Sequence, residues 1–242
     1  MALDFLGIGA QKAGTTWLYE NLARHPGIAF PGGKEMHFWD AQRHLGLDWY
    51  RSVFATEARC AGEITPAYAL LPDAVVAEIR RAFPDVRLIF LMRNTLDRAW
   101  SSALMAMRRA ELDYAEVSPH WFHDHFRSRG SLARGDYLRS IEVWHRHFGE
   151  DRLLTVLFED ILRKPREALE RCVRHLGVDP APLAAVPDEV LGQRVHAGPG
   201  IPMPDSMRAF LLDLYADRLD ALEARFGRAV SQWRQEPGTR AG

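Results

Sequence analysis

The chain has 242 residues, of which 47% are hydrophobic and 26% are charged, and its formal net charge is −1 at pH 7. This composition is typical of one sizeable globular domain, and the near-neutral charge gives no indication of nucleic acid or an anionic membrane as a partner. Cys60 and Cys172 lie far apart and form no CxxC motif, so neither a disulfide framework nor a zinc site is expected. The N-terminal segment lacks a basic n-region and no apolar stretch approaches the ~20 residues of a membrane span, so we expect a cytoplasmic protein without a membrane partner.

The first predicted unit is a strand, a loop of small residues and a helix. An apolar run begins at Phe5, and a helical pattern with Trp17 and Leu18 follows the loop. The loop consists of Gln11, Lys12, Ala13, Gly14, Thr15 and Thr16. The free N–H groups of a helix N-terminus, a close-approach glycine and a lysine together fit a bound phosphate. The Walker A pattern would place its lysine where Thr15 stands, and an ordinary turn with a solvated lysine is the alternative.

The next segments alternate between strand and helix. In chain order we predict a short apolar strand at Ile28–Phe30, a loop with a short helix over Pro31–Asp40, an amphipathic segment over Leu47–Phe54, a strand over Arg59–Ile64, a helix over Asp73–Phe83, a buried strand over Val86–Met92 and a helix over Leu96–Arg109.

The second half of the chain continues the pattern less regularly. Asp113–Gly130, which is rich in aromatics and histidine, is predicted to be less regular, and Val178–Pro204 to be mostly loop. Ordered elements are predicted as helices over Tyr137–Phe148, Arg166–Leu176 and Asp205–Phe226, and as a buried strand over Arg152–Phe158.

Strands that alternate with helices predict an α/β fold. We expect a single domain over residues 1–242, with a three-layer, P-loop-like architecture: a mainly parallel sheet flanked by helices on both faces. The last residues, about 234–242, are expected to form a flexible tail. Ligands of such sheets bind beyond the carboxyl ends of the strands, which selects Lys12, Glu63, Arg93 and Glu159 as candidates.

The nucleotide-side segments resemble sulfotransferases that use 3′-phosphoadenosine 5′-phosphosulfate (PAPS). QKAGTTWL is similar to their 5′-phosphosulfate loop, and LIFLMRNTLDRAWS to their 3′-phosphate segment, in which an arginine and a serine correspond to Arg93 and Ser101. The resemblance implies that Trp17 stacks on adenine, although a helix tryptophan can equally belong to the core. It also implies a late loop that closes over the nucleotide, with His196, Ala197 and Gly198.

The acceptor-side segments resemble the heparan-type and carbohydrate branch of the same family. AGEITPAY is similar to a stretch whose glutamate is the catalytic base, which assigns that role to Glu63; a carboxylate that caps the next turn is the alternative. KEMHFWD resembles KEPHFFD and implies acceptor roles for Lys34 and His37, with His37 the second candidate base. The same resemblance places three aromatic side chains at the acceptor, Tyr68, Trp121 and Tyr137.

The function implied is transfer of a sulfuryl group from PAPS to a hydroxyl, or less often an amine, of a small-molecule or carbohydrate acceptor. Lys12 would stabilise the leaving group, adenosine 3′,5′-bisphosphate (PAP) would be the product, and no metal would be required. His120, His123 and His125 suit a polar helix face better than a metal site. A P-loop kinase and a nucleotide-binding module without catalysis are the alternatives. No feature of the sequence indicates an oligomeric state.

Overall fold

The computed structural model describes residues 3–193, 195 and 200–234, and the chain divides into two compact units. Unit 1 comprises residues 1–92 and 140–195, and unit 2 comprises residues 93–139 and 196–242. Each unit has its own architecture, and each is described by itself.

Unit 1 is built on a parallel sheet. Its strands are β1 (Phe5–Gly9), β2 (Ile28–Ala29), β3 (Cys60–Ile64), β4 (Arg87–Met92) and β5 (Leu153–Leu157). They lie in the order β2-β3-β1-β4-β5, and every pair is parallel. β1, β3 and most of β4 are buried, which explains why these strands read as apolar runs without alternation.

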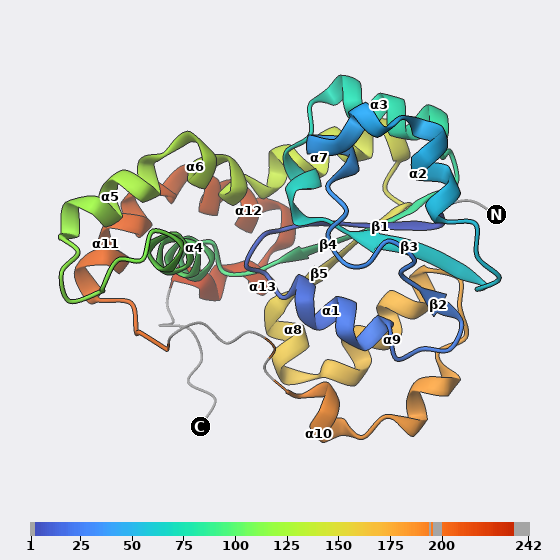
Figure 1. Cartoon of the computed structure of the whole chain (residues 1–242). Helices are drawn as coiled ribbons and strands as arrows, with labels where there is room; N and C mark the ends of the chain where they lie inside the picture. The colour runs from blue at the N-terminus through green and yellow to red at the C-terminus, as the bar shows by residue number, and fades with distance from the viewer. Residues whose placement is uncertain (1–2, 194, 196–199, 235–242) are drawn as a thin grey trace. The chain divides into compact units, whose positions relative to one another are not determined.

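Helices cover both faces of this sheet (Figure 1). On one face lie α1 (Thr15–Leu22), α8 (Phe158–Arg163), α9 (Pro165–His175) and α10 (Asp188–Leu191). On the other face lie α2 (Leu47–Val53), α3 (Asp73–Ala82) and α7 (Tyr137–Phe148), of which residues 140–148 belong to unit 1. The short helices of unit 1 are η1 (Phe38–Gln42), η2 (Arg43–Leu45), η3 (Pro66–Leu70) and η4 (Ala181–Ala185). The predicted α/β fold with a parallel sheet between two helical layers is confirmed.

The described part of unit 2 is helical. Its elements are α4 (Thr95–Arg109), α5 (Pro119–Arg127), α6 (Arg129–Gly135), α11 (Asp205–Leu214), α12 (Ala216–Phe226), α13 (Arg228–Ser231) and η5 (Gln232–Arg234). The Asn94 side chain caps α4 by accepting a hydrogen bond from the Leu96 amide at 3.0 Å. Trp100 stacks on Phe122 with ring centroids 5.1 Å apart, and this pair joins α4 to α5.

One prediction for unit 2 is wrong. The predicted helix over Asp205–Phe226 breaks at Tyr215, whose φ of −106° and ψ of 9° leave the helical region. The break accompanies burial of the tyrosine, whose hydroxyl donates to the Ser131 carbonyl at 3.4 Å. Within the less regular segment Asp113–Gly130, the helix α5 buries Phe122 and Phe126, which lie one turn apart.

Smaller differences occur at the loops and the C-terminus. The predicted loop Val178–Pro204 includes η4 and α10. Of the predicted tail, Arg234 ends η5 and residues 235–242 lie outside the described residues. None of the helices found within residues 3–193 and 200–234 has the length and apolarity needed to cross a membrane.

Candidate active site

The predicted phosphate loop joins β1 to α1 in unit 1. Gly14 is the N-cap of α1 with a φ of 95°, and Lys12 has a φ of 69°. A Cβ atom on Gly14 would lie 2.9 Å from Cδ2 of Phe158, so both the backbone conformation and the space require glycine. The first N–H groups of α1 have no intrahelical acceptors, and Lys12 is half-buried in the same loop. These residues fit a 5′-phosphate or phosphosulfate group.

Trp17 is buried in the same unit, on α1. Its side chain is 5% exposed, and its indole N–H donates to the Leu191 carbonyl at 2.7 Å. The tryptophan therefore packs α1 against α10, as the core alternative expects. Its predicted stacking on adenine stays a prediction.

Glu63 lies within β3, and its carboxylate is completely buried. Among the described residues, two tyrosine hydroxyls donate to Oε1: Tyr50 at 2.5 Å and Tyr68 at 2.9 Å. On Oε2 the donors are the Thr65 hydroxyl at 2.5 Å and the Met36 amide at 3.3 Å. Burial raises the pKa of Glu63, and these hydrogen bonds oppose the rise. The raised pKa suits a base, but the burial and the four donors hold the carboxylate away from solvent.

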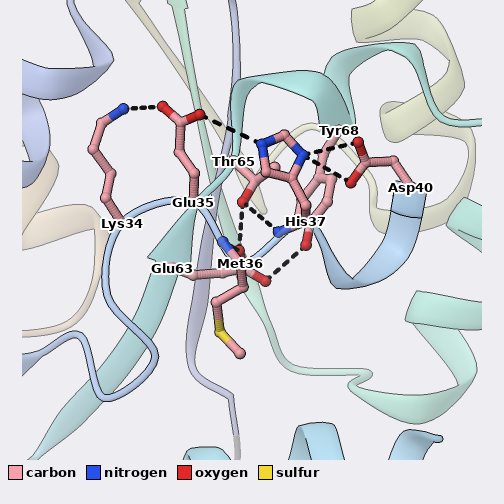
Figure 2. A network of polar contacts seen from close by, with 8 residues as sticks. All are labelled: Lys34, Glu35, Met36, His37, Asp40, Glu63, Thr65 and Tyr68. Atoms are coloured by element: carbon pink, nitrogen blue, oxygen red, sulfur yellow. Dashed lines mark hydrogen bonds and ion pairs between the residues drawn. The ribbon is translucent and has the colours of Figure 1, made fainter. Parts of the chain in front are cut away.

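The Glu63 network anchors the segment that contains KEMHFWD (Figure 2). The Lys34 carbonyl accepts the Ile64 amide at 3.1 Å, and the His37 amide donates to the Thr65 hydroxyl at 3.4 Å. With the Met36 contact to Glu63, these bonds fasten residues 34–37 to the end of β3. Phe38 completes the anchor by stacking on Tyr50, with centroids 4.2 Å apart.

The other side chains of this segment form an exposed charged series, which we call the Lys34–Asp40 series. Lys34 pairs with Glu35, Glu35 Oε2 lies 3.5 Å from Nε2 of His37, and Nδ1 of His37 lies 2.9 Å from Asp40. The Glu35 side chain is 40% exposed and that of His37 is 36% exposed. The series therefore presents a carboxylate, an imidazole and an ammonium group to solvent.

The charges of this series set the protonation of His37. Burial lowers the pKa of His37, but the hydrogen bond and charge of Asp40 and the charge of Glu35 outweigh it, so the pKa is raised above its ordinary value. A raised pKa keeps more of the imidazole protonated near neutral pH. It then donates to the two carboxylates instead of accepting a proton.

Arg93 and Ser101, the predicted 3′-phosphate residues, are both in unit 2 and both half-buried. Arg93 follows β4 directly in the chain, and its carbonyl accepts the Tyr137 hydroxyl at 2.9 Å. Burial raises the pKa of Asp97, and the charges of Arg93 and Arg208 oppose this rise. Tyr137 is 1% exposed, so its contact in the structure is with Arg93 instead of open solvent.

The remaining predicted residues are distributed as follows. Tyr68 is fully buried against Glu63, and Trp121 is half-buried and parallel to His125, at a centroid distance of 5.6 Å and an interplanar angle of 14°. The structure forms no cluster of three or more His, Cys, Asp or Glu side chains suited to a metal ion within its described ranges. His196, Ala197 and Gly198 lie outside the described residues.

Sequence reasoning missed two members of the Lys34–Asp40 series. Glu35 and Asp40 both lie in the KEMHFWD segment, from which only Lys34 and His37 were predicted as site residues. The available signal was a mixture of charged and apolar residues after a Gly-Gly pair. It would have placed the charged members on the exposed side, because Phe38 and Trp39 are buried.

Comparison with known proteins agrees with this arrangement. Residues 3–194 match the family described as sulfotransferase domain. The chain is 31% identical over 180 residues to mouse heparan sulfate glucosamine 3-O-sulfotransferase 3A1, a match that covers 71% of this chain and 44% of the mouse protein. It is 27% identical over 198 residues to the bifunctional heparan sulfate N-deacetylase/N-sulfotransferase 1 of Caenorhabditis briggsae, covering 74% of this chain and 23% of that protein. The chain thus spans less than half the length of these relatives.

Solved structures show the same likeness in three dimensions. A sulfotransferase from Alicyclobacillus acidocaldarius superposes with a TM-score of 0.75 at 25% identity, covering 97% of this chain and 99% of the other. Mouse sulfotransferase SULT7A1 complexed with PAP has the same fold, with a TM-score of 0.64 at 16% identity over 96% of this chain and 88% of the other. With the sequence match that extends over residues 3–194, these similarities show that the chain belongs to the sulfotransferase family.

Proposed function

We propose that this protein transfers a sulfuryl group from PAPS to a hydroxyl, or less often an amine, of its acceptor. The observation that carries the proposal is that unit 1 contains both features that such a transfer needs. One is the loop of Lys12 at the N-terminus of α1, and the other is the exposed carboxylate and imidazole of the Lys34–Asp40 series, which is anchored to β3. PAPS supplies the sulfuryl group and, when bound, a phosphate leaving group. The protein's part in such a transfer is positioning and neutralisation of charge.

The phosphate loop holds the donor end of this reaction. Lys12 and the first amides of α1, with Thr15 and Thr16, hold the 5′-phosphosulfate, and Lys12 neutralises charge on the departing phosphate. Arg93 and Ser101 hold the 3′-phosphate, where a guanidinium fork can contact two oxygens and the serine hydroxyl a third.

Glu35 is the group that we propose as the base. A general base must reach the proton that it removes, and geometry takes precedence over pKa in the choice. Burial raises the pKa of Glu63 but also leaves its side chain 0% exposed. Glu35 is exposed and lies next to His37, whose raised pKa favours its role as a donor. Glu63 is then a positioning residue, which holds the segment through Met36 and Thr65.

The acceptor that we propose is a carbohydrate or a small molecule. Support for a carbohydrate comes from the relatives named for heparan sulfate, at 31% and 27% identity. Lys34 and His37 offer this acceptor cationic contacts beside Glu35.

A reducing compartment, such as the cytoplasm, is the location that we propose for the protein. It is supported by Cys60 and Cys172, which are both buried free thiols.

The donor assignment is tested by the 3′-phosphate, which PAPS and PAP carry and AMP lacks. Isothermal titration of PAP and AMP against the wild type should show at least a roughly 100-fold preference for PAP, because each charge-assisted hydrogen bond contributes ~1.5–3 kcal/mol and 1.4 kcal/mol is a factor of ten. Arg93→Ala should remove most of this preference and leave AMP binding almost unchanged. Arg139→Ala, an exposed arginine of the same unit, is the matched control.

Other outcomes separate the alternatives. Equal affinity of the wild type for PAP and AMP would contradict the donor assignment, and tighter binding of ATP with magnesium would indicate a kinase. Binding of PAP without transfer to any of a broad panel of hydroxyl and amine acceptors would indicate a module without catalysis.

A further inference from the structure

A buried arginine in unit 2 has hydrogen-bond donors without acceptors. Arg98 lies on α4 with 0% exposure, and its Nη2 donates to the Ser131 carbonyl at 3.2 Å. Its Nε and Nη1 have no hydrogen-bond partner among the residues that the structure describes. The hydroxyl of Ser131, also buried, has none either. Buried polar groups in proteins are nearly always hydrogen-bonded, so this cluster calls for a further group.

The charge of Arg98 is also unbalanced. No carboxylate in the described ranges forms an ion pair with Arg98, whereas other arginines, such as Arg43, Arg152 and Arg166, do have such partners. A buried charge without a counter-charge is strongly unfavourable, since it has lost its hydration and gained nothing in return. The group that completes the cluster should therefore be negatively charged.

The neighbours of Arg98 are further donors and cations. Ser102, one turn along α4, is 5% exposed, and its hydroxyl lies 3.4 Å from Nε2 of His125. Burial, then the charges of Arg98 and Arg134, lower the pKa of His125. Burial, then the charges of Arg98 and Arg109, lower the pKa of Arg134. The guanidinium group of Arg98 therefore lies near both the His125 imidazole and the Arg134 guanidinium group.

We propose that unit 2 binds a tetrahedral oxyanion, a sulfate or phosphate group, at Arg98, with Ser102, His125, Ser131 and Arg134 around it. An oxyanion has several acceptor oxygens, so it can satisfy the guanidinium donors and the serine hydroxyls at once, which a halide cannot do as well. His125 and Arg134 are half-buried, so the ion would reach Arg98 past these two side chains. The site uses none of the residues assigned to the nucleotide, and it does not depend on the proposed function.

The oxyanion can be a free ion or a group carried on a larger molecule, and two titrations distinguish these sources. The protein, saturated with PAP to fill the phosphate-binding positions assigned to the nucleotide, is titrated with sodium sulfate in one arm and with glucose 6-sulfate in the other. Sodium chloride at equal ionic strength is the reference for both. Thermal unfolding and isothermal titration are the readouts.

We expect the wild type to bind sulfate, the sugar sulfate or both, and to unfold at a higher temperature in their presence. Arg98→Met should bind at least about tenfold more weakly, because it removes charge-assisted hydrogen bonds. Without oxyanion this variant should unfold at or above the wild-type temperature, since it removes an unbalanced buried charge. Arg108→Met, an exposed arginine on the same helix, is the matched control and should behave as the wild type.

The outcomes decide the proposal. Binding in the first arm indicates a free ion, and binding only in the second indicates an ester group; both support the site if Arg98→Met loses it. Should Arg98→Met fail to fold, Arg134→Met replaces it. Because the Arg134 side chain is only half-buried, this variant should fold, and it should also bind the oxyanion more weakly than the wild type. No response beyond sodium chloride in either arm, or unchanged binding by the folded variants, would overturn the site.

Discussion

At the scale of single residues, Glu63 and Glu35 show how the burial of a carboxylate affects the chemical role that it can have. Glu63 and Glu35 are joined through the backbone of Met36, yet one is completely buried and the other is 40% exposed. The buried carboxylate accepts hydrogen bonds from two tyrosines and a threonine, so its oxygens are committed to structure. The exposed one forms ion pairs with Lys34 and His37.

Separate Gln variants of Glu35 and Glu63 should therefore fail in different ways. Glu35→Gln should lower turnover by roughly 100- to 10,000-fold, the usual contribution of a positioned base, with the unfolding temperature nearly unchanged. Glu63→Gln should lower the unfolding temperature by ~2–12 °C, because an unsatisfied buried group costs ~1–3 kcal/mol and each kcal/mol shifts a chain of this size by ~2–4 °C. Steady-state kinetics and calorimetry measure both effects.

Glu57→Gln, an exposed glutamate of the same unit, is the control and should change neither quantity. Full turnover in Glu35→Gln, together with an inactive but equally stable Glu63→Gln, would return the role of base to Glu63.

His37 provides a pH test of the Lys34–Asp40 series. NMR titration of its ring should give a pKa above the ordinary value for histidine, because of Asp40 and Glu35. Since the folded-state pKa is raised, the stabilisation from the charged imidazole is fully present below the unfolded-state pKa and is lost as the pH rises through the folded-state value. Asp40→Asn should lower the pKa of His37, and Asp48→Asn should not. A His37 pKa at or below the ordinary value in the wild type would contradict the arrangement.

At the scale of elements, the junction of β1 with α1 is the most constrained feature of unit 1. Gly14 combines a left-handed backbone with contact to the ring of Phe158 at the start of α8. The loop and α1 therefore pack closely against α8 at Gly14, because this residue has no side chain.

A matched pair of glycine substitutions tests this junction. Gly14→Ala should destabilise the protein by more than Gly149→Ala. Both positions have a positive φ, where an L-residue costs ~1–2 kcal/mol, but a Cβ on Gly149 meets nothing within 4 Å, whereas one on Gly14 would overlap with Phe158. Urea unfolding of the two variants measures the difference. Equal losses would mean that Phe158 moves aside without cost.

Elements that arise from local pattern were predictable from the sequence. The strand at Phe5, the glycine before α1 and the buried strand that ends at Met92 follow from runs of neighbouring residues. Features set by distant residues were not. Tyr215 breaks a helix because of a carbonyl 84 positions earlier.

The same reason applies to the candidate site. Glu63 is saturated by Tyr50, 13 positions away, and by the amide of Met36, 27 positions away, and a motif that gives only the neighbours of Glu63 cannot show this. The series beside it was partly predicted, as Lys34 and His37, because its members are close in sequence.

At the scale of the whole molecule, both cysteines belong to unit 1 and both are buried. Cys60 begins β3 and Cys172 lies on α9. Burial raises the pKa of each thiol to about 12, so at neutral pH the reactive thiolate is scarce as well as inaccessible.

Thiol labelling should therefore report unfolding of unit 1. With a chromogenic disulfide reagent at pH 8, the native protein should react slowly or not at all, and the denatured protein should release two equivalents, as its two cysteines require. The denaturant concentration at which labelling becomes fast should match the transition seen by circular dichroism. Rapid labelling of the native protein would show that β3 or α9 opens locally.

The hydroxyls that surround Glu63 have a consequence for the evolution of this protein. Tyr50 and Tyr68 are both fully buried, and Thr65 is also without exposure, yet all three share the carboxylate that anchors residues 34–37. If natural variants were compared only by their loss of activity, these three residues could not be told apart from residues that contact the substrate. Their substitutions should instead be mutually dependent, because loss of one donor frees an oxygen that a compensating residue can take over. The exposed side chains of residues 34–40 can thus change one at a time, while the buried hydroxyls and their carboxylate change only as a set.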